Sequence, residues 1–161
     1  MNSSTGNTER RPALFSAVLF IAIIVAISLA VGYLTRPGEW YENLAKPVFN
    51  PPSWVFGPVW TVLYILIAVA GWRIWRIAPG SAAMMLWIAQ MILNWLWSLT
   101  FFGAEAPWLA LAVIVALLVS IVGFMALSAR HDHLSAWLFV PYAVWVTFAT
   151  VLNGSVAALN Q

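Results

Sequence analysis

The chain has 161 residues, of which 63% are hydrophobic and 7% are charged, and its mean hydropathy is +0.91. This composition excludes a water-soluble globular domain and indicates that the bilayer is the solvent. A net charge of +2 is too small and too dispersed to predict nucleic-acid binding, and the lack of cysteine excludes disulfides, cysteine metal sites and thiol nucleophiles.

Long uncharged stretches predict membrane-spanning helices. A helix that rises about 1.5 Å per residue needs roughly 20 apolar residues to cross a hydrocarbon core of about 30 Å. The stretches that meet this length are residues 13–34, 54–72, 81–104, 106–129 and 134–159. We therefore expect a polar, disordered tail over residues 1–12 and a single all-α membrane domain, a five-helix bundle, over residues 13–161.

Basic residues predict the orientation of this bundle. The N-terminus and the connections on its side of the membrane carry five of them, and the first loop on the other side carries two. The five are Arg10, Arg11, Arg73, Arg76 and Arg130, against Arg36 and Lys46. This bias favours a cytoplasmic N-terminus. Such an all-helical chain fits a bacterial inner membrane better than an outer membrane, which stays the alternative.

The first connection, residues 36–53, is long and rich in proline, so one continuous helix cannot cover it. A short interfacial turn is expected over residues 39–45. The other connections are short, which makes neighbouring helices antiparallel.

Neutral polar residues lie inside the predicted spans, which contain no ionisable group other than tyrosine. That pattern counts against an ion-driven transporter. Gln90 and Asn94 are four residues apart and share one helix face, which Trp97 and Phe101 continue. Such a face serves either hydrogen bonding between helices or contact with a ligand.

Depth along the helices brings aromatic residues from separate spans to similar levels. At about 1.5 Å per residue from the outer side, the count gives Trp60 and Trp97 at about 10 Å, Asn94 and Ala149 at about 15 Å, and Trp145 and Tyr64 somewhat deeper. If the second, third and fifth spans are neighbours, these residues line one aromatic cavity beneath the first connection. Such a cavity suits a large, flat, apolar ligand.

Three long blocks of the sequence resemble one known family. Residues 46–64 (KPVFNPPSWVFGPVWTVLY) look like the signature of the tryptophan-rich sensory protein (TspO) or translocator protein family, once called peripheral benzodiazepine receptors. Residues 90–103 (QMILNWLWSLTFFG) resemble its third-helix motif, and residues 140–153 (VPYAVWVTFATVLN) resemble its fifth. The resemblance covers the chain from about Gly32 to Asn153.

This resemblance implies a five-helix bundle, commonly a homodimer, that acts as a receptor, sensor or transporter with a regulatory role in tetrapyrrole metabolism. Protoporphyrin IX or haem would be its ligand, and no cofactor is expected to be required. The pocket positions of the family fall on Trp60, Asn94, Trp97, Trp145 and Ala149. Further candidates for the pocket are Tyr64, Gln90, Phe101 and Tyr142. The expected lid residues are Arg36, Trp40, Lys46, Pro47, Phe49 and Pro51.

Two other functions stay open at this point. Some bacterial members are reported to degrade protoporphyrin in light, which would here rely on redox chemistry of Trp60 and Trp145. The chain could also act as a membrane scaffold through partner proteins.

Departures from the family limit the ligands that we expect. Gly154 and Ala158 stand where animal members carry a Tyr and an Arg of a proposed cholesterol motif, so we predict no specific cholesterol binding. In the loop, Val48 and Phe49 stand where many relatives carry at least one tryptophan. The expected pocket has neither His nor Cys, which leaves a haem iron no strong axial ligand except a tyrosinate. We therefore expect no metal site, and metal-free porphyrin should bind at least as well as haem, with Arg36 or Lys46 near its propionates.

Overall fold

The computed structural model describes residues 6–161, with side chains from Leu14 onward, and no strand occurs among them. The helices are α1 (Gly6–Leu34), α2 (Glu39–Asn43), α3 (Ser53–Ile77), α4 (Ala82–Ser98), the π-helical turn η1 (Leu99–Gly103), α5 (Pro107–Ser128), α6 (His133–Leu138) and α7 (Val140–Leu159). The predicted all-α class is confirmed.

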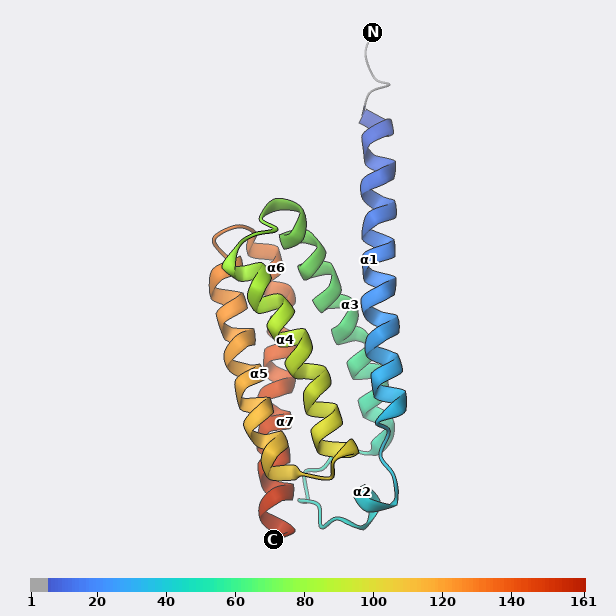
Figure 1. Cartoon of the computed structure of the whole chain (residues 1–161), viewed down its shortest axis with the longest axis vertical. Coiled ribbons are helices and arrows are strands. Elements are labelled where there is room, and N and C mark those ends of the chain that lie inside the picture. Colours follow the sequence, from blue (N-terminus) through green and yellow to red (C-terminus); the bar gives the residue numbers. More distant parts are fainter. Residues whose placement is uncertain (1–5) are drawn as a thin grey trace.

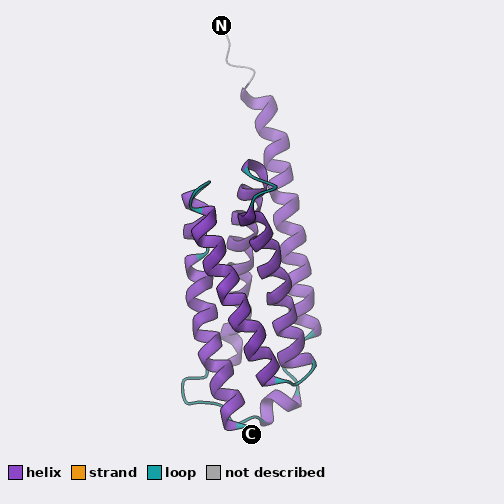
Figure 2. Ribbon diagram, turned by 60° about the vertical axis from the view of Figure 1, so that its left-hand side comes forward, coloured by secondary structure: helices purple, strands orange, loops and turns teal. Residues whose placement is uncertain are grey.

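Five helical segments are long and apolar enough to cross a membrane, which confirms the predicted number of spans. They are Leu14–Leu34, Ser53–Ile77, Ala82–Gly103, Pro107–Ser128 and His133–Leu159. These segments run up and down side by side (Figures 1 and 2). Residues 35–52, which include α2, join α1 to α3 and cover one end of the bundle, where the C-terminus also lies (Figure 1). We call residues 35–52 the roof.

Two helix boundaries differ from the prediction. α1 begins at Gly6 and so includes part of the predicted polar tail, whose first five residues lie outside the described residues. α3 continues past Trp72 to Ile77, because no proline or glycine interrupts the chain before Pro79. The last turns of α3 therefore carry Arg73 and Arg76, although the predicted span contained no charge. Hydropathy measures the length of a span, whereas a helix continues until its backbone hydrogen bonding is broken.

The fifth predicted span, residues 134–159, is divided into α6 and α7 at Phe139. Pro141 lies in the first turn of α7, where its missing N–H and fixed φ angle suit a helix start and not a helix interior. Phe139 itself stays in the right-handed helical region, so His133–Leu159 still forms one span, as predicted, with an interruption at Phe139.

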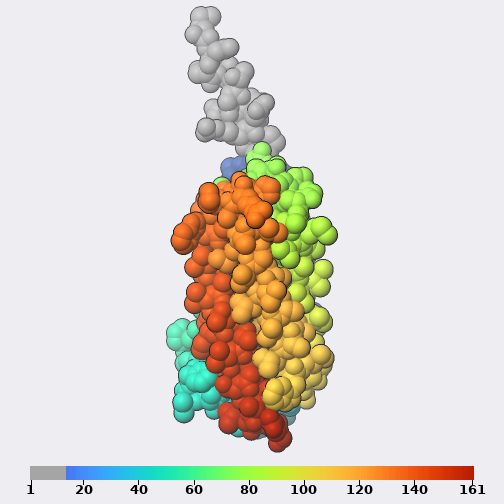
Figure 3. Space-filling model, turned by 90° about the vertical axis from the view of Figure 1, so that its left-hand side faces the viewer, coloured from blue at the N-terminus to red at the C-terminus, as the bar shows by residue number. Residues whose placement is uncertain are grey.

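The membrane helices form a ring in which each packs against its neighbours. α1 contacts α3 and α4, α4 packs on α5, α5 packs on α7, and α3 packs on α6 and α7. Figure 3 shows α5 and α7 side by side on one face of the molecule. The interior of this ring is filled by fully buried side chains such as Ile67, Leu117, Ile121 and Phe139.

A glycine allows α3 to approach α4 closely in this core. A Cβ atom at Gly71 would lie 2.2 Å from Cε2 of the Trp87 ring. The Trp87 Nε1–H donates a hydrogen bond of 2.9 Å to the backbone carbonyl of Ile67, one turn before Gly71. The buried indole therefore has its polar atom satisfied only while position 71 stays without a side chain.

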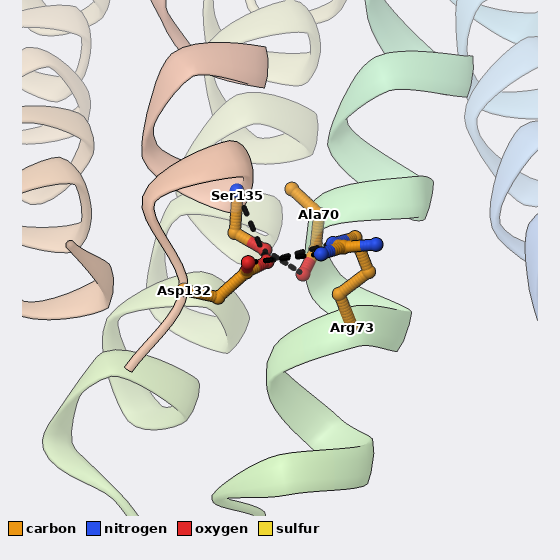
Figure 4. A network of polar contacts seen from close by, with 4 residues as sticks. All are labelled: Ala70, Arg73, Asp132 and Ser135. Atoms are coloured by element: carbon orange, nitrogen blue, oxygen red, sulfur yellow. Dashed lines mark hydrogen bonds and ion pairs between the residues drawn. The ribbon is translucent and has the colours of Figure 1, made fainter. Parts of the chain in front are cut away.

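An ion pair ties α3 to the α5–α6 turn at the end opposite the roof (Figure 4). Arg73 donates from Nε at 2.7 Å and from Nη2 at 2.9 Å to the two carboxylate oxygens of Asp132. Asp132 is also the N-cap of α6 and accepts from the backbone N–H of Ser135 at 3.1 Å. The hydrogen bonds from Arg73, and secondarily those from Ser135, hold the pKa of Asp132 well below its usual range.

Replacing this carboxylate isolates the contribution of the ion pair. Asp132→Asn keeps a good N-cap residue but removes the charge, and we expect a loss of about 1 kcal/mol of stability at neutral pH. Because the folded-state pKa is lowered, the wild-type advantage should be full above the ordinary carboxyl pKa of about 4 and should disappear as the pH falls below it. Thermal unfolding of both proteins in detergent between neutral and acid pH measures this difference, with Glu39→Gln as the control. A difference that is constant with pH would contradict the assignment.

Candidate ligand-binding cavity

A cavity of about 830 Å³ lies beneath the roof, between α1, α3 and α4. α3 contributes Ser53, Phe56, Gly57, Trp60 and Tyr64, and the third span contributes Asn94, Trp97, Ser98 and Phe102. α1 contributes Ser28, Leu29, Gly32 and Tyr33, and the roof contributes Thr35, Pro37, Tyr41, Glu42, Lys46, Asn50, Pro51 and Pro52. The lining combines aromatic and proline side chains with polar groups, as in sites for small organic molecules that have both apolar and polar parts.

Stacked aromatic rings form one wall of this cavity. Trp60 lies on Tyr64 with 5.3 Å between ring centroids and 28° between ring planes. Trp97 lies 6.4 Å from Trp60 at 31°, and it stacks on Phe101 at 5.7 Å. Trp60 and Tyr64 are one turn apart on α3, as are Trp97 and Phe101 on the third span, so each pair projects from one helix face. Neighbouring rings in the wall are thus inclined to one another by 28° and 31°.

Asn94 forms the deep polar end of the cavity and joins three helices. Its Oδ1 accepts from the Tyr64 hydroxyl at 3.0 Å, and its Nδ2 donates to the Tyr142 hydroxyl oxygen at 3.0 Å. The Asn94 side chain is almost fully buried, with 2% of its residue surface exposed. Its amide thus forms hydrogen bonds between helices and also lies at the cavity wall. Hydrogen bonding between helices and contact with a ligand are therefore compatible at this position.

The roof is held by its own side chains and by the end of α7. Tyr41 packs edge-on against Phe102 at 5.4 Å and donates to Asn50 Oδ1 at 3.3 Å. Asn160 accepts from the backbone N–H of Ala45 and donates to its carbonyl, both at 2.9 Å. Burial raises the pKa of the Tyr41 phenol, so this cavity-lining group stays neutral at physiological pH.

Lys46 is the lysine at the cavity surface. Its ammonium lies over the Tyr41 ring at 4.7 Å and donates to the carbonyls of Glu42 and Leu44 at 2.9 and 3.2 Å. An ammonium has three N–H donors, and two are used here, so the third is available to an anionic group of a ligand.

The structure separates the predicted site residues into groups. Those that line the cavity are Trp60, Tyr64, Asn94, Trp97, Lys46 and Pro51. A crevice of about 30 Å³ beside it shares Trp60 and Trp97 and is completed by Phe101, Trp145 and Ala149 among others. The fully buried Gln90 and Tyr142 line neither space. From the expected lid, Arg36, Trp40, Pro47 and Phe49 do not line the cavity.

Trp145 and Ala149 thus line the adjoining crevice and not the main cavity, although the two spaces share Tyr41, Phe56, Trp60, Trp97 and Phe102. The depth count places residues at the right level, but it does not show on which side of the aromatic wall each helix lies. α7 lies behind Trp60 and Trp97, and there Trp145 packs edge-on against Phe56 at 5.8 Å.

The sequence analysis missed the contribution of α1 and of the residue that follows it. Ser28 and Thr35 are seven residues apart and therefore lie on one side, facing α4. The Trp95 Nε1–H donates to Ser28 Oγ at 3.1 Å, and the hydroxyls of Thr35 and Ser98 are hydrogen-bonded to each other. Ser28 near the end of an apolar span, with Thr35 at helical spacing just after it, was the signal that could have identified this face.

Comparison with known proteins decides the family of this bundle. A sequence model of the TspO/MBR family matches residues 20–159, which include every residue that lines the cavity. The chain belongs to the TspO/MBR family. The resemblance seen in the sequence blocks is thereby confirmed, and the chain is an integral membrane protein of this sensor and translocator family.

Relatives of this TspO/MBR protein occur in bacteria and animals. It is 38% identical to the tryptophan-rich sensory protein of Cereibacter sphaeroides over 144 residues, which is 88% of this chain and 91% of the relative. It is 37% identical to the tryptophan-rich protein TspO of Chlorobaculum tepidum, over 89% of this chain and 97% of the relative. With the human translocator protein the identity is 36%, over 71% of each chain.

Proposed function

We propose that this TspO/MBR protein is a membrane receptor, sensor or transporter that binds porphyrins such as protoporphyrin IX and related flat apolar ligands, with a regulatory role in tetrapyrrole metabolism. The observation that carries this proposal is the wall of Trp60, Tyr64 and Trp97 rings inside a cavity of about 830 Å³. That volume lies within the range of roughly 300–1,000 Å³ that is typical of small-molecule sites.

The polar groups of the cavity support an amphipathic ligand of this kind. Aromatic side chains favour offset stacking of a planar macrocycle. Lys46 at the roof and Asn94 at the deep end lie at opposite ends of the aromatic wall, which leaves the apolar body of a ligand between them. The carboxylates of a porphyrin would lie on the roof side, near Lys46 and the membrane surface.

The test is a titration of the purified protein in detergent with protoporphyrin IX in the dark, followed by tryptophan fluorescence. We expect saturable quenching at low micromolar ligand, because a porphyrin bound to the protein accepts excitation energy from its tryptophans. Quenching that rises linearly without saturation would overturn the proposal and favour the scaffold function. The same complex under illumination tests the light-dependent degradation of porphyrin, which requires loss of porphyrin absorbance beyond that in a protein-free control.

Haem provides a second arm of this titration. Among the described residues, no histidine lines the cavity, and His131 and His133 lie at the opposite end of the bundle. The raised pKa of Tyr41 disfavours a tyrosinate ligand. We expect haem to bind no more tightly than protoporphyrin IX, with dissociation constants equal within about threefold and no Soret shift of the axial-histidine type. A shifted Soret band that disappears when both histidines are replaced by alanine would contradict this expectation.

Placement in a bacterial inner membrane with a cytoplasmic N-terminus is part of the proposal and is supported by the distribution of basic residues. A homodimer is likewise proposed. The exposed alanines of α1, Ala22, Ala26 and Ala30, lie on one face and allow close approach of a second copy. Specific cholesterol binding is not expected, because Gly154 and Ala158 supply neither an aromatic nor a basic side chain.

A further inference from the structure

Eight residues both line the cavity and are exposed. Three of them, Pro37, Glu42 and Pro52, belong to the roof, and the five that belong to α1 and α3 define what we call the mouth. Leu29, Gly32 and Tyr33 come from α1, and Ser53 and Gly57 come from α3. Leu29 is 44% exposed and Tyr33 is 68% exposed. Exposed residues in the cavity lining mark where the cavity opens, so the opening lies along the seam between α1 and α3 and continues to the three exposed roof residues.

The other seam of α1 is closed. Ser28 and Thr35 also line the cavity, but they are 0% and 6% exposed because their hydroxyls are hydrogen-bonded to Trp95 and Ser98 across the α1–α4 seam. At the α1–α3 seam the corresponding positions are glycines. A Cβ atom at Gly32 or Gly57 would meet no atom within 4 Å, so space is open beside both helices.

The mouth faces the bilayer over part of its length. Leu29 lies five residues before the end of α1, and Gly57 lies four residues after the start of α3. At about 1.5 Å per residue the opening therefore extends roughly 6–8 Å from the helix ends toward the membrane centre. Its edges there are leucine, tyrosine and glycine, which suit acyl chains. Arg36, whose guanidinium lies over the Tyr33 ring at 5.1 Å, supplies a cation at headgroup level.

The roof also has three exposed lining residues, Pro37, Glu42 and Pro52, but its backbone and Tyr41 are held in place. Asn160 holds the backbone of Ala45 by two hydrogen bonds, and Tyr41 is buried against Phe101 and Phe102. Entry from water through the roof would require these contacts to break, whereas the mouth requires no hydrogen bond to break.

We propose that ligands enter and leave the cavity sideways from the bilayer, through the mouth between α1 and α3. The inference rests on the proposed function, because it concerns how the ligand of this cavity arrives. This route requires a flat amphipathic ligand that is dissolved in one leaflet of the bilayer. Its polar edge would lie at the headgroups and its apolar body at the depth of Gly32 and Gly57.

The test fills the mouth and measures rates. Gly32→Leu combined with Gly57→Leu places side chains in open space on two helices, where leucine also has the higher helix propensity, so folding should be retained. Protoporphyrin IX is supplied in lipid vesicles to the reconstituted protein, and stopped-flow tryptophan quenching gives both rate constants. We expect both rate constants to fall by about tenfold or more, because a blocked passage slows entry and exit alike, whereas a weakened site would make dissociation faster.

Two controls separate the routes. Gly80→Leu adds the same side chain in open space between α3 and α4 at the opposite end, and its rates should match the wild type. Asn160→Ala loosens the roof without touching the cavity lining, and its rates should also be unchanged. Faster exchange in Asn160→Ala together with wild-type rates in the double glycine variant would overturn the lateral route and assign the roof instead. Absence of saturable quenching in the wild type would instead overturn the proposed function itself.

Discussion

Trp60→Ala is expected to weaken protoporphyrin IX binding more than any other single change at the cavity wall. The Trp60 ring lies between Tyr64 and Trp97, so its removal opens the middle of the stacked surface. Stacking of a planar ring on an aromatic side chain contributes about 1–3 kcal/mol, which corresponds to roughly fivefold to 150-fold in the dissociation constant. Titration by porphyrin absorbance, which does not depend on the removed fluorophore, measures the effect.

Trp137→Ala is the matched control for this change. Trp137 lies on α6 at the opposite end of the bundle and is 70% exposed, so its loss should leave the dissociation constant unchanged. Trp60→Phe should fall between the two because it keeps a smaller ring. Equal affinities of Trp60→Ala and Trp137→Ala would place the porphyrin outside the cavity.

Gly71→Ala is expected to have the largest effect on stability. The added methyl group would lie 2.2 Å from the Trp87 ring, which would have to move and lose its hydrogen bond to the Ile67 carbonyl. Overpacking of this kind costs about 1–3 kcal/mol, and the buried indole N–H left without a partner adds about 1–3 kcal/mol. The gain in helix propensity of about 1 kcal/mol offsets only part of this loss. Thermal unfolding in detergent, followed by near-UV circular dichroism of tryptophan, measures the difference.

Gly154→Ala on α7 provides the comparison. Its Cβ would meet Leu111 at 3.7 Å, an ordinary van der Waals contact, so the variant should be as stable as the wild type or slightly more stable. If both alanine variants unfolded at the same temperature, the close approach of α3 to α4 would not depend on Gly71.

The polar residues of the third span illustrate what could be inferred before the fold was known. Spacing placed Asn94 and Trp97 on one face, and the depth count placed them level with Trp60 and Tyr64, which the structure also brings together. The spacing and the depth count could not show that Asn94 lines the cavity whereas Gln90 does not. Gln90 lies one turn deeper and donates to the backbone carbonyl of Trp87 instead of facing the cavity.

The sequence alone determined the number of spans, their approximate bounds and the family. Crossing lipid requires long apolar helices with internally satisfied backbone groups, and this requirement is visible in composition. The tertiary structure decided which faces meet: that α1 completes the cavity, that Trp145 lies behind the aromatic wall, and that the mouth opens beside Gly32 and Gly57. In a bilayer the outer and inner faces of a helix are both apolar, so hydrophobic periodicity, which identifies the buried face in water, carries little of that information here.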